Sequence, residues 1–287
     1  MVLPIDKWVQ EATDDANREF RQAAHTILLA ISSGKNLKSN MILKGGILLA
    51  IRYQSHRFTK DIDLSTATPF DCIDPATVIA ELNQSLALAV NTLDYGLDCI
   101  VQSWSIDPKV ENPTYPSIKI SIGYAYKGTA KHKRLAAKQS PSVISLDYSL
   151  NEPLPNIEVL ALTDGGEILV YSIIDVMAEK LRSLLQQEDR KRYRRQDIFD
   201  IFLLLELKNE FTVAEKDNIL ASMITKSHAR GIFPTAESFD NPELKRRAQE
   251  LYPTLASEID GELPNFDIMF KQVADFYRSL PWPQQQS

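Results

Sequence analysis

Residues 43–65 read LKGGILLAIRYQSHRFTKDIDLS and place two aspartates, Asp61 and Asp63, on either side of a single isoleucine. On a strand, residues two apart point to the same side, so both carboxylates project together while their apolar neighbours enter a core. Two carboxylates held this close repel each other, and a divalent cation removes that conflict. Mg²⁺ prefers oxygen ligands and is commonly shared between one or two carboxylates and a substrate phosphate. We therefore predict a strand that carries a magnesium site. A surface turn is the alternative, and the apolar Ile62 and Leu64 argue against it.

The Gly-Gly pair of the same stretch supplies a complementary feature. Lys44, Gly45 and Gly46 lie between a short apolar stretch, residues 41–43, and residues 47–52, which we predict to form a helix. Backbone without a side chain lets a phosphate approach the N–H groups at a helix N-terminus. A Gly-Gly pair also makes ordinary turns, so both a phosphate site and a plain turn are open at this position.

A third carboxylate is predicted on a neighbouring strand. In residues 142–150 the large apolar side chains share one face, and Asp147 lies on the other face. Residues 117–126 alternate in the same way. Three acids on adjacent strands could hold two metal ions, one activating the attacking oxygen and one stabilising the leaving phosphate. We therefore expect Asp147 to join Asp61 and Asp63.

The rest of the chain separates into a mixed part and a helical part. Periodicity predicts helices over residues 5–33 and 74–90, a loop over 33–40, strands over 97–106, 117–126 and 142–150, and a hairpin at Gly165-Gly166. Further helices are predicted near residues 172–187, 195–208, 213–226, 242–251 and 267–280, and the PQQQS tail is expected to be disordered. The fold class is therefore α+β, with a mixed β-sheet domain flanked by helices (residues 1–165) and an α-helical domain (residues 166–287).

Composition indicates an ordinary globular protein, with 44% hydrophobic and 24% charged residues among 287. The N-terminal residues lack the basic and apolar layout of a signal peptide, and no apolar run approaches the roughly 20 residues that cross a bilayer. The two cysteines, Cys72 and Cys99, have no metal-binding spacing and form no disulfide framework. We therefore expect a cytoplasmic protein without a membrane partner.

Charge is uneven along a chain whose net charge is −6. Residues 127–138 (KGTAKHKRLAAK) and 190–195 (RKRYRR) are basic and contain no acid. Such segments indicate local binding of an anion such as an RNA backbone. Solvated faces of a loop or helix are the alternative for either segment.

Two charged residues of the helical part are predicted to point inward. At 100° per residue, Lys180 falls within the apolar arc of its helix, and Asp197 lies between apolar positions of the next one. A lysine that faces a core is costly unless it meets an anion, so the two side chains are expected to pair. A snorkelling lysine and an acid that favours the helix dipole are the alternatives.

Together these features resemble the nucleotidyltransferase superfamily, in which a Gly-Gly or Gly-Ser turn precedes a D-x-D strand. The chain is more similar to the AbiEii family of nucleotidyltransferase toxins, which includes MenT-like toxins. The matching elements are Lys44-Gly45-Gly46, Arg52, Arg57 with Asp61-Ile62-Asp63-Leu64, Glu179-Lys180-Leu181, and the run from Arg194 to Ile201 that contains Asp197 and Asp200. Many relatives have Thr or Ser after the glycines, whereas Ile47 here leaves the phosphate to backbone N–H groups and Lys44.

The resemblance implies a nucleotidyltransferase-like sheet domain and transfer of a nucleoside monophosphate from an NTP·Mg²⁺ complex to an acceptor, with release of pyrophosphate. It implies a toxin with a cognate antitoxin, in abortive infection or phage defence, and an RNA acceptor such as the tRNA 3′ end. The implied metal ligands are Asp61, Asp63 and Asp147, the catalytic set adds Lys180 and Asp197, and the nucleotide-binding residues are Lys44, Gly45, Gly46, Arg57, Lys180 and Arg194. Two alternatives remain open: modification of protein hydroxyls, and a catalytically weak nucleotide-binding or protein-interaction module.

Overall fold

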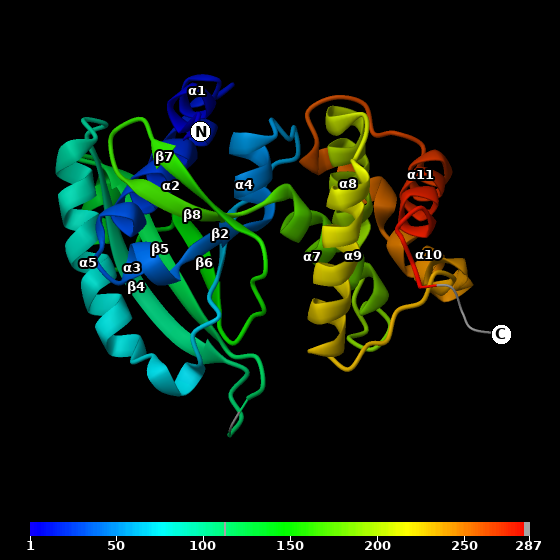
Figure 1. Cartoon of the computed structure of the whole chain (residues 1–287). Coiled ribbons are helices and arrows are strands. Elements are labelled where there is room, and N and C mark those ends of the chain that lie inside the picture. Colours follow the sequence, from blue (N-terminus) through cyan, green and yellow to red (C-terminus); the bar gives the residue numbers. More distant parts are fainter. Residues whose placement is uncertain (112, 284–287) are drawn as a thin grey trace. The chain divides into compact units, whose positions relative to one another are not determined.

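The computed structural model describes residues 1–111 and 113–283, so residues 284–287 of the tail predicted to be disordered lie outside the described residues (Figure 1). The chain forms two compact units. Unit 1 comprises Met1–Arg52 and Thr59–Val170, and unit 2 comprises Tyr53–Phe58 and Tyr171–Ser287. The short segment between Arg52 and Thr59 therefore belongs with the helical part of the chain.

A mixed sheet of eight strands runs through the described residues of unit 1. The strands are β1 (Val2–Leu3), β2 (Ile42–Lys44), β3 (Asp61–Ser65), β4 (Leu97–Asp107), β5 (Ser117–Tyr126), β6 (Val143–Ser149), β7 (Ile157–Leu162) and β8 (Glu167–Tyr171). Their spatial order is β1-β7-β8-β2-β3-β6-β5-β4, with β3 parallel to β6 and antiparallel to β2. The predicted strands are confirmed, and a turn through Gly165 and Gly166 joins β7 to β8 as expected.

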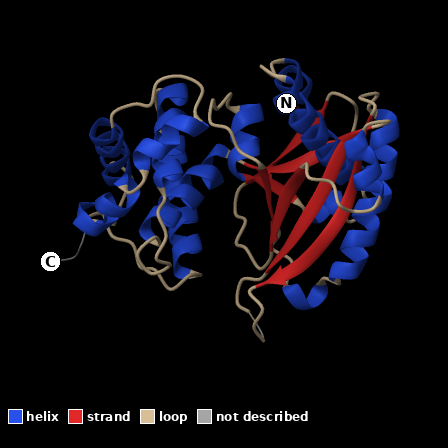
Figure 2. Cartoon of the chain, turned by 180° about the vertical axis from the view of Figure 1, so that it is seen from behind, coloured by secondary structure: helices blue, strands red, loops and turns tan. Residues whose placement is uncertain are grey.

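Two long helices cover one face of this sheet (Figure 2). The helices of unit 1 are α1 (Ile5–Gln10), α2 (Asp15–Ser33), α3 (Leu37–Asn40), α4 (Gly45–Arg52), α5 (Pro75–Thr92) and α6 (Ala130–Ala136), with the 3₁₀ turn η1 (Phe70–Cys72). Helices α2 and α5 pack on each other, and both contact β4. The apolar face predicted for β5 and β6 is buried, because Ile118, Ile122 and Ile144 are all 0% exposed. The polar residues that alternate with these isoleucines in β5 and β6 therefore lie on the opposite face of the sheet.

Two sequence predictions in the N-terminal region were wrong. A single helix over residues 5–33 is instead two helices, because the Asp14 carboxylate accepts a hydrogen bond from the Asn17 N–H at 2.8 Å and starts α2 afresh. The predicted loop over 33–40 contains α3, a single helical turn. A helix of four residues is too short to show a 3.6-residue periodicity in the sequence.

Unit 2 is helical, as predicted. Its helices are α7 (Ile173–Leu185), α8 (Arg195–Lys208), α9 (Val213–His228), α10 (Pro242–Gln249) and α11 (Phe266–Arg278), with the 3₁₀ segments η2 (Ser238–Asp240) and η3 (Tyr252–Glu258). One face of α8 is buried, since Ile198, Ile201 and Leu204 are 0% exposed, whereas Leu207 is 53% exposed. No helix in the described part of the chain is long and apolar enough to cross a membrane.

Buried charges fasten the segment Tyr53–Phe58 to the helices of unit 2. The Phe58 N–H donates to the Glu258 carbonyl at 2.6 Å. Nε and Nη2 of Arg57 each donate to the Asp200 carboxylate at 2.9 Å, and Lys180 Nζ donates to the same carboxylate at 2.7 Å. Burial alone would raise the pKa of Asp200, but Arg57 and Lys180 outweigh it and lower that pKa to about 2. Asp200 therefore neutralises two cations in a site without solvent.

The substitution Asp200→Asn is expected to lower the free energy of unfolding at pH 7 by about 3 kcal/mol or more. Asparagine keeps the shape of the side chain but removes the charge that pairs with Arg57, and it leaves Lys180 with Asp197 in place of two carboxylates. Urea unfolding of the full chain measures the loss. The exposed Asp217 on α9 supplies the matched control, and Asp217→Asn should change stability by less than about 0.5 kcal/mol. Equal stability of the two variants would contradict this account.

Acid should remove the same contribution. Because the pKa of Asp200 is lower in the folded protein than the ordinary 3.8, the unfolded chain takes up the proton first as the pH falls. The stabilisation is complete above about pH 4 and is lost as the pH approaches about 2. The difference in unfolding free energy between the wild type and Asp200→Asn should therefore shrink across this window. A difference that stays constant down to pH 2 would show that the charge of Asp200 is not its source.

Candidate active site

A row of charged side chains crosses four adjacent strands on the sheet face opposite α2 and α5. Lys44 pairs with Asp63, Asp63 with Asp147, and Asp147 with Lys119, in the register of β2, β3, β6 and β5. Side chains at paired positions lie on the same face and are neighbours at the strand spacing of about 5 Å. The register thus places two acids in the centre of the row and one lysine at each end.

Asp61 lies two residues before Asp63 on β3, so its side chain is on the same face of the sheet. Its cross-strand partner is Ser145 on β6, which in turn pairs with Ser121 on β5. Burial and the charge of Asp147 raise the pKa of Asp61, while Lys119 and Lys60 oppose the shift. Burial is the larger cause of this shift, and the acid that repels Asp61 here is Asp147, whereas the sequence analysis expected repulsion from Asp63.

The two oxygens of Asp147 have different surroundings. Oδ2 accepts a hydrogen bond from Lys119 Nζ. Oδ1 is buried and has no hydrogen-bond partner among the described residues. The sequence analysis missed Lys119, although the alternation of β5 already placed it on the polar face. A buried carboxylate oxygen without a donor is costly, so it is suited to accept a cation or a proton from a ligand.

The glycine turn lies against this acidic row. Gly45 has φ +72°, a conformation that favours glycine, and a Cβ there would overlap the Asp63 carboxylate, with Cγ only 2.8 Å away. A Cβ on Gly46 would lie 2.9 Å from Thr59 Cγ2. Helix α4 begins directly at these glycines, and Ile47 is 0% exposed. Ile47 therefore serves the core, and the N-terminus of α4 meets Asp63 through bare backbone.

These residues fit a divalent cation. Asp61 and Asp63 share one face of β3, and Asp147 adds a buried oxygen without a partner. Carboxylate oxygens are the ligands that Mg²⁺ prefers. The three carboxylates do not all come within 4.8 Å of one another, whereas Asp6, His25 and Asp164 do, among the residues described. The fit is therefore best for Asp61 and Asp63, with Asp147 turned toward Lys119.

The sequence analysis did not identify the cluster around His25. His25 Nδ1 lies 2.8 Å from the Tyr95 hydroxyl, and Nε2 lies 2.9 Å from the Asp164 carboxylate. His25 is 0% exposed, and burial lowers its pKa against the opposing pull of Asp164 and Asp6. His25, which lies on α2, therefore links this helix to α1 through Asp6 and to the β7–β8 turn through Asp164.

In unit 2, Lys180 and Asp197 are paired, as the helix periodicity predicts. Lys180 is 8% exposed, and its Nζ donates to Asp197 at 3.0 Å as well as to Asp200. Burial opposes the charge, but Asp200 and Asp197 raise the pKa of Lys180 above its ordinary value. Arg194 Nη1 lies 3.7 Å from Asp197. Asp200, which the sequence analysis left without a role, is the most buried member of this cluster.

Acids face part of both basic segments, and in the second one Arg194 lies 3.7 Å from Asp197 and Arg195 lies 2.6 Å from Glu258. Within residues 127–138, Lys127 and His132 face Asp98 at 3.4 and 2.6 Å, and Lys131 faces Glu19 at 3.0 Å. Part of this segment therefore has a structural role, and it forms α6. In residues 190–195, Arg190 has a lowered pKa because of burial and the nearby charges of Arg230, Arg192, Arg182 and Arg194. The second segment is thus part of a dense arginine cluster.

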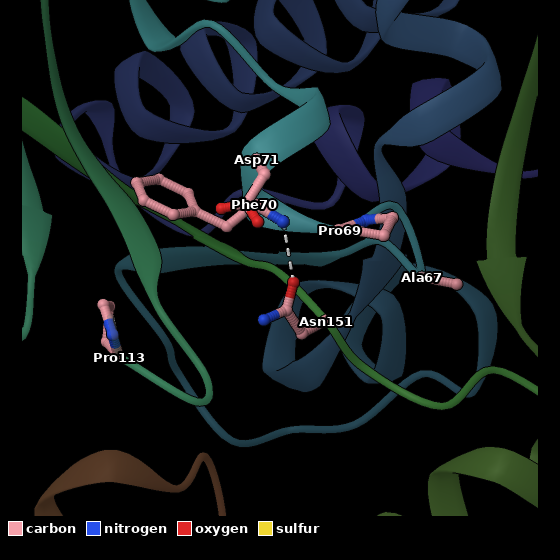
Figure 3. A pocket seen from close by; sticks show the side chains of 6 residues that line it. All are labelled: Ala67, Pro69, Phe70, Asp71, Pro113 and Asn151. Atoms are coloured by element: carbon pink, nitrogen blue, oxygen red, sulfur yellow. Dashed lines mark hydrogen bonds between the residues drawn. The ribbon is translucent and has the colours of Figure 1, made fainter.

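A pocket of about 400 Å³ lies elsewhere on unit 1, where the chain leaves β3 and β6 (Figure 3). Its lining includes Phe70, whose N–H donates to Asn151 at 2.8 Å, and a single acid, Asp71. None of the residues singled out by the sequence lines it. The pocket is therefore not the site that the sequence predicts.

The substitution Gly45→Ala is expected to cost about 3 kcal/mol or more of unfolding free energy. An alanine is strained at a positive φ, and its side chain would also clash with Asp63. Gly96 in the same unit has φ +64° with open space around it, so Gly96→Ala should cost only about 1 kcal/mol. Urea unfolding of both variants separates the two effects, and equal losses would mean that the contact with Asp63 is unimportant.

Comparisons with known proteins agree with this architecture. A family model described as "Nucleotidyl transferase AbiEii toxin, Type IV TA system" matches residues 27–276. MenT4, a nucleotidyltransferase toxin from Mycobacterium tuberculosis H37Rv, has a similar fold with a TM-score of 0.59 at 14% identity, covering 96% of this chain and 90% of that one. JHP933 from Helicobacter pylori has a TM-score of 0.52 at 13% identity, covering 94% and 93%. No curated protein sequence matches the chain.

The likeness to these structures concerns the fold, whereas the family match spans most of the sequence. That span contains the glycine turn, the three acids on the sheet, and the paired lysine and aspartate of unit 2. A family of this kind implies a nucleotide substrate and an antitoxin partner. The chain belongs to the AbiEii family of type IV toxin–antitoxin systems and is a nucleotidyltransferase toxin.

Proposed function

We propose that this toxin uses Mg²⁺ to transfer a nucleoside monophosphate from an NTP to an RNA acceptor, specifically a tRNA 3′ end, with release of pyrophosphate. The observation that carries the proposal is the contact of the Asp63 carboxylate with the Gly45 backbone. It puts a cation-binding acid beside the N-terminus of a helix, where phosphate is stabilised by N–H groups and the helix dipole. Metal and triphosphate would thus be bound side by side.

The reaction needs a bond to form and another to break at the α-phosphorus. The acceptor hydroxyl oxygen attacks that phosphorus, and the bond to the bridging oxygen breaks, so that pyrophosphate leaves. When bound, Mg²⁺ supplies charge neutralisation for the phosphates. Asp61 and Asp63 hold the ion, and Asp147 completes the acidic site, where its buried Oδ1 accepts the hydroxyl proton. Backbone N–H groups at Gly45 and Gly46, with Lys44, bind phosphate.

Unit 2 contributes the residues that handle nucleotide and acceptor. Lys180, Asp197 and Arg194 form one group of contacts there, which supports a shared role in positioning. For Arg57, the double hydrogen bond to Asp200 favours support of that group over the direct nucleotide contact implied by the resemblance.

An RNA acceptor is favoured over a protein hydroxyl by the basic segments. Both segments keep basic side chains for which the structure gives no acidic partner among the described residues, although acids face part of each. Arginine clusters suit the dense negative charge of an RNA backbone. We place the protein in the cytoplasm, where NTPs and tRNA are available, as the toxin of a phage-defence pair held in check by its antitoxin.

Incubation of the purified chain with each labelled NTP, Mg²⁺ and total cellular RNA or protein tests the proposal. Label is expected in RNA, and chelation of the metal should abolish it. Asp61→Asn should reduce incorporation by about 100-fold or more, since even the loss of a group that merely supports a metal ligand costs about 10- to 100-fold.

Asp71→Asn, at an exposed acid of the same unit outside the acidic row, is the matched control and should retain activity. Label in protein rather than RNA would replace the proposed acceptor with a protein hydroxyl. Label in neither fraction with any NTP would overturn the proposal.

A further inference from the structure

One aromatic side chain lies within the second basic segment, residues 190–195. Tyr193 is 43% exposed, and Arg192 and Arg194 flank it in the sequence. Burial and the charges of four further arginines lower the pKa of Arg190, so like charges gather on this surface. The tyrosine ring is therefore presented to solvent among cationic groups.

Acids pair with only one end of this segment. The acids that face it, Asp197 and Glu258, lie beside its last two residues. For residues 190–192, which are exposed, the structure gives no acidic partner among the residues it describes. Two exposed acids at positions 188–189 precede these basic side chains and form no ion pair with them in that part of the chain. An RNA phosphate can therefore bind residues 190–192 without displacing an acid.

The turn that carries Tyr193 is fixed to the helices of unit 2. The Arg192 N–H donates to the Gln187 carbonyl at 2.8 Å. Gln187 is 1% exposed, and its side chain donates to the Leu244 carbonyl of α10 at 2.7 Å. The ring is thus held by a turn with a buried anchor, which reduces the entropy that is lost when a ligand binds.

The same turn leads directly into the pair that we propose to position nucleotide and acceptor. Asp197 accepts a hydrogen bond from Lys180 at 3.0 Å, and it lies four residues after Tyr193 in the sequence. Residues four apart have Cα atoms separated by about 15 Å at most. An RNA strand bound at Tyr193 therefore lies within a few nucleotides of this pair.

We propose that Tyr193 stacks on an unpaired base of bound RNA, so that this surface selects single-stranded RNA over duplex RNA. The inference rests on the proposed function, because it concerns how an RNA acceptor is bound. Basic side chains bind the phosphates of any RNA, paired or unpaired. An aromatic ring stacks on a base only where the face of that base is open, and the bases of a duplex already cover one another. Tyr193 thus adds a preference for unpaired RNA that phosphate contacts do not give.

Fluorescence anisotropy of a labelled RNA of about 12 nucleotides tests this preference on the full chain without NTP, with the RNA single-stranded or annealed to its complement. Tyr193→Ala should weaken binding of the single strand by about 10-fold and leave binding of the duplex unchanged. Tyr193→Phe keeps the ring and should bind as the wild type does. Tyr193→Leu is apolar without a ring and should bind as weakly as the alanine variant.

Trp104→Ala is the matched control. Trp104 on β4 is also 43% exposed but has no Lys or Arg within three residues on either side, so its loss should leave both affinities unchanged. Unchanged single-strand affinity in Tyr193→Ala, an equal loss for both forms of RNA, or a wild type that binds neither form would overturn the role of Tyr193. Failure of the proposed function has a different signature: no NTP label enters RNA, although Tyr193-dependent binding of the single strand is intact.

Discussion

The Asp63 carboxylate lies against the backbone of Gly45, and the candidate active site depends on this contact. A side chain at position 45 would overlap the carboxylate, and the positive φ of that residue further favours glycine. Because β2 and β3 are antiparallel neighbours, the end of one strand and the start of the other are brought to the same place. The pairing of β2 with β3 thus brings the N-terminus of α4, which follows β2 directly, next to Asp63.

Charge compensation follows one logic in both units. On the sheet, Asp63 and Asp147 lie side by side with a lysine at each end of the row, Lys44 next to Asp63 and Lys119 next to Asp147. In unit 2 the signs are reversed: Asp200 is the buried centre, and Arg57 and Lys180 surround it. Buried ions are tolerated when they are paired in good geometry, and the cluster around Asp200 meets that condition.

Membership of the AbiEii family gives the enzyme class of this chain. Ile47 replaces the Ser or Thr common after the glycines, and its burial shows that this position is used by the core. Acids face part of both basic segments: Asp98 and Glu19 lie beside residues 127–138, and Asp197 and Glu258 lie beside Arg194 and Arg195.

The sequence by itself determined the strands that carry Asp61, Asp63 and Asp147, the faces of β5 and β6, and the inward direction of Lys180, because period-2 and period-3.6 patterns are local. It missed the break at Asp14, where a cap outweighs periodicity. Only the tertiary structure decided that Lys119 meets Asp147, that Arg57 reaches Asp200 and that His25 lies between Tyr95 and Asp164. These partners are far apart in the chain, and their pairing depends on strand register and helix packing, which no local pattern encodes.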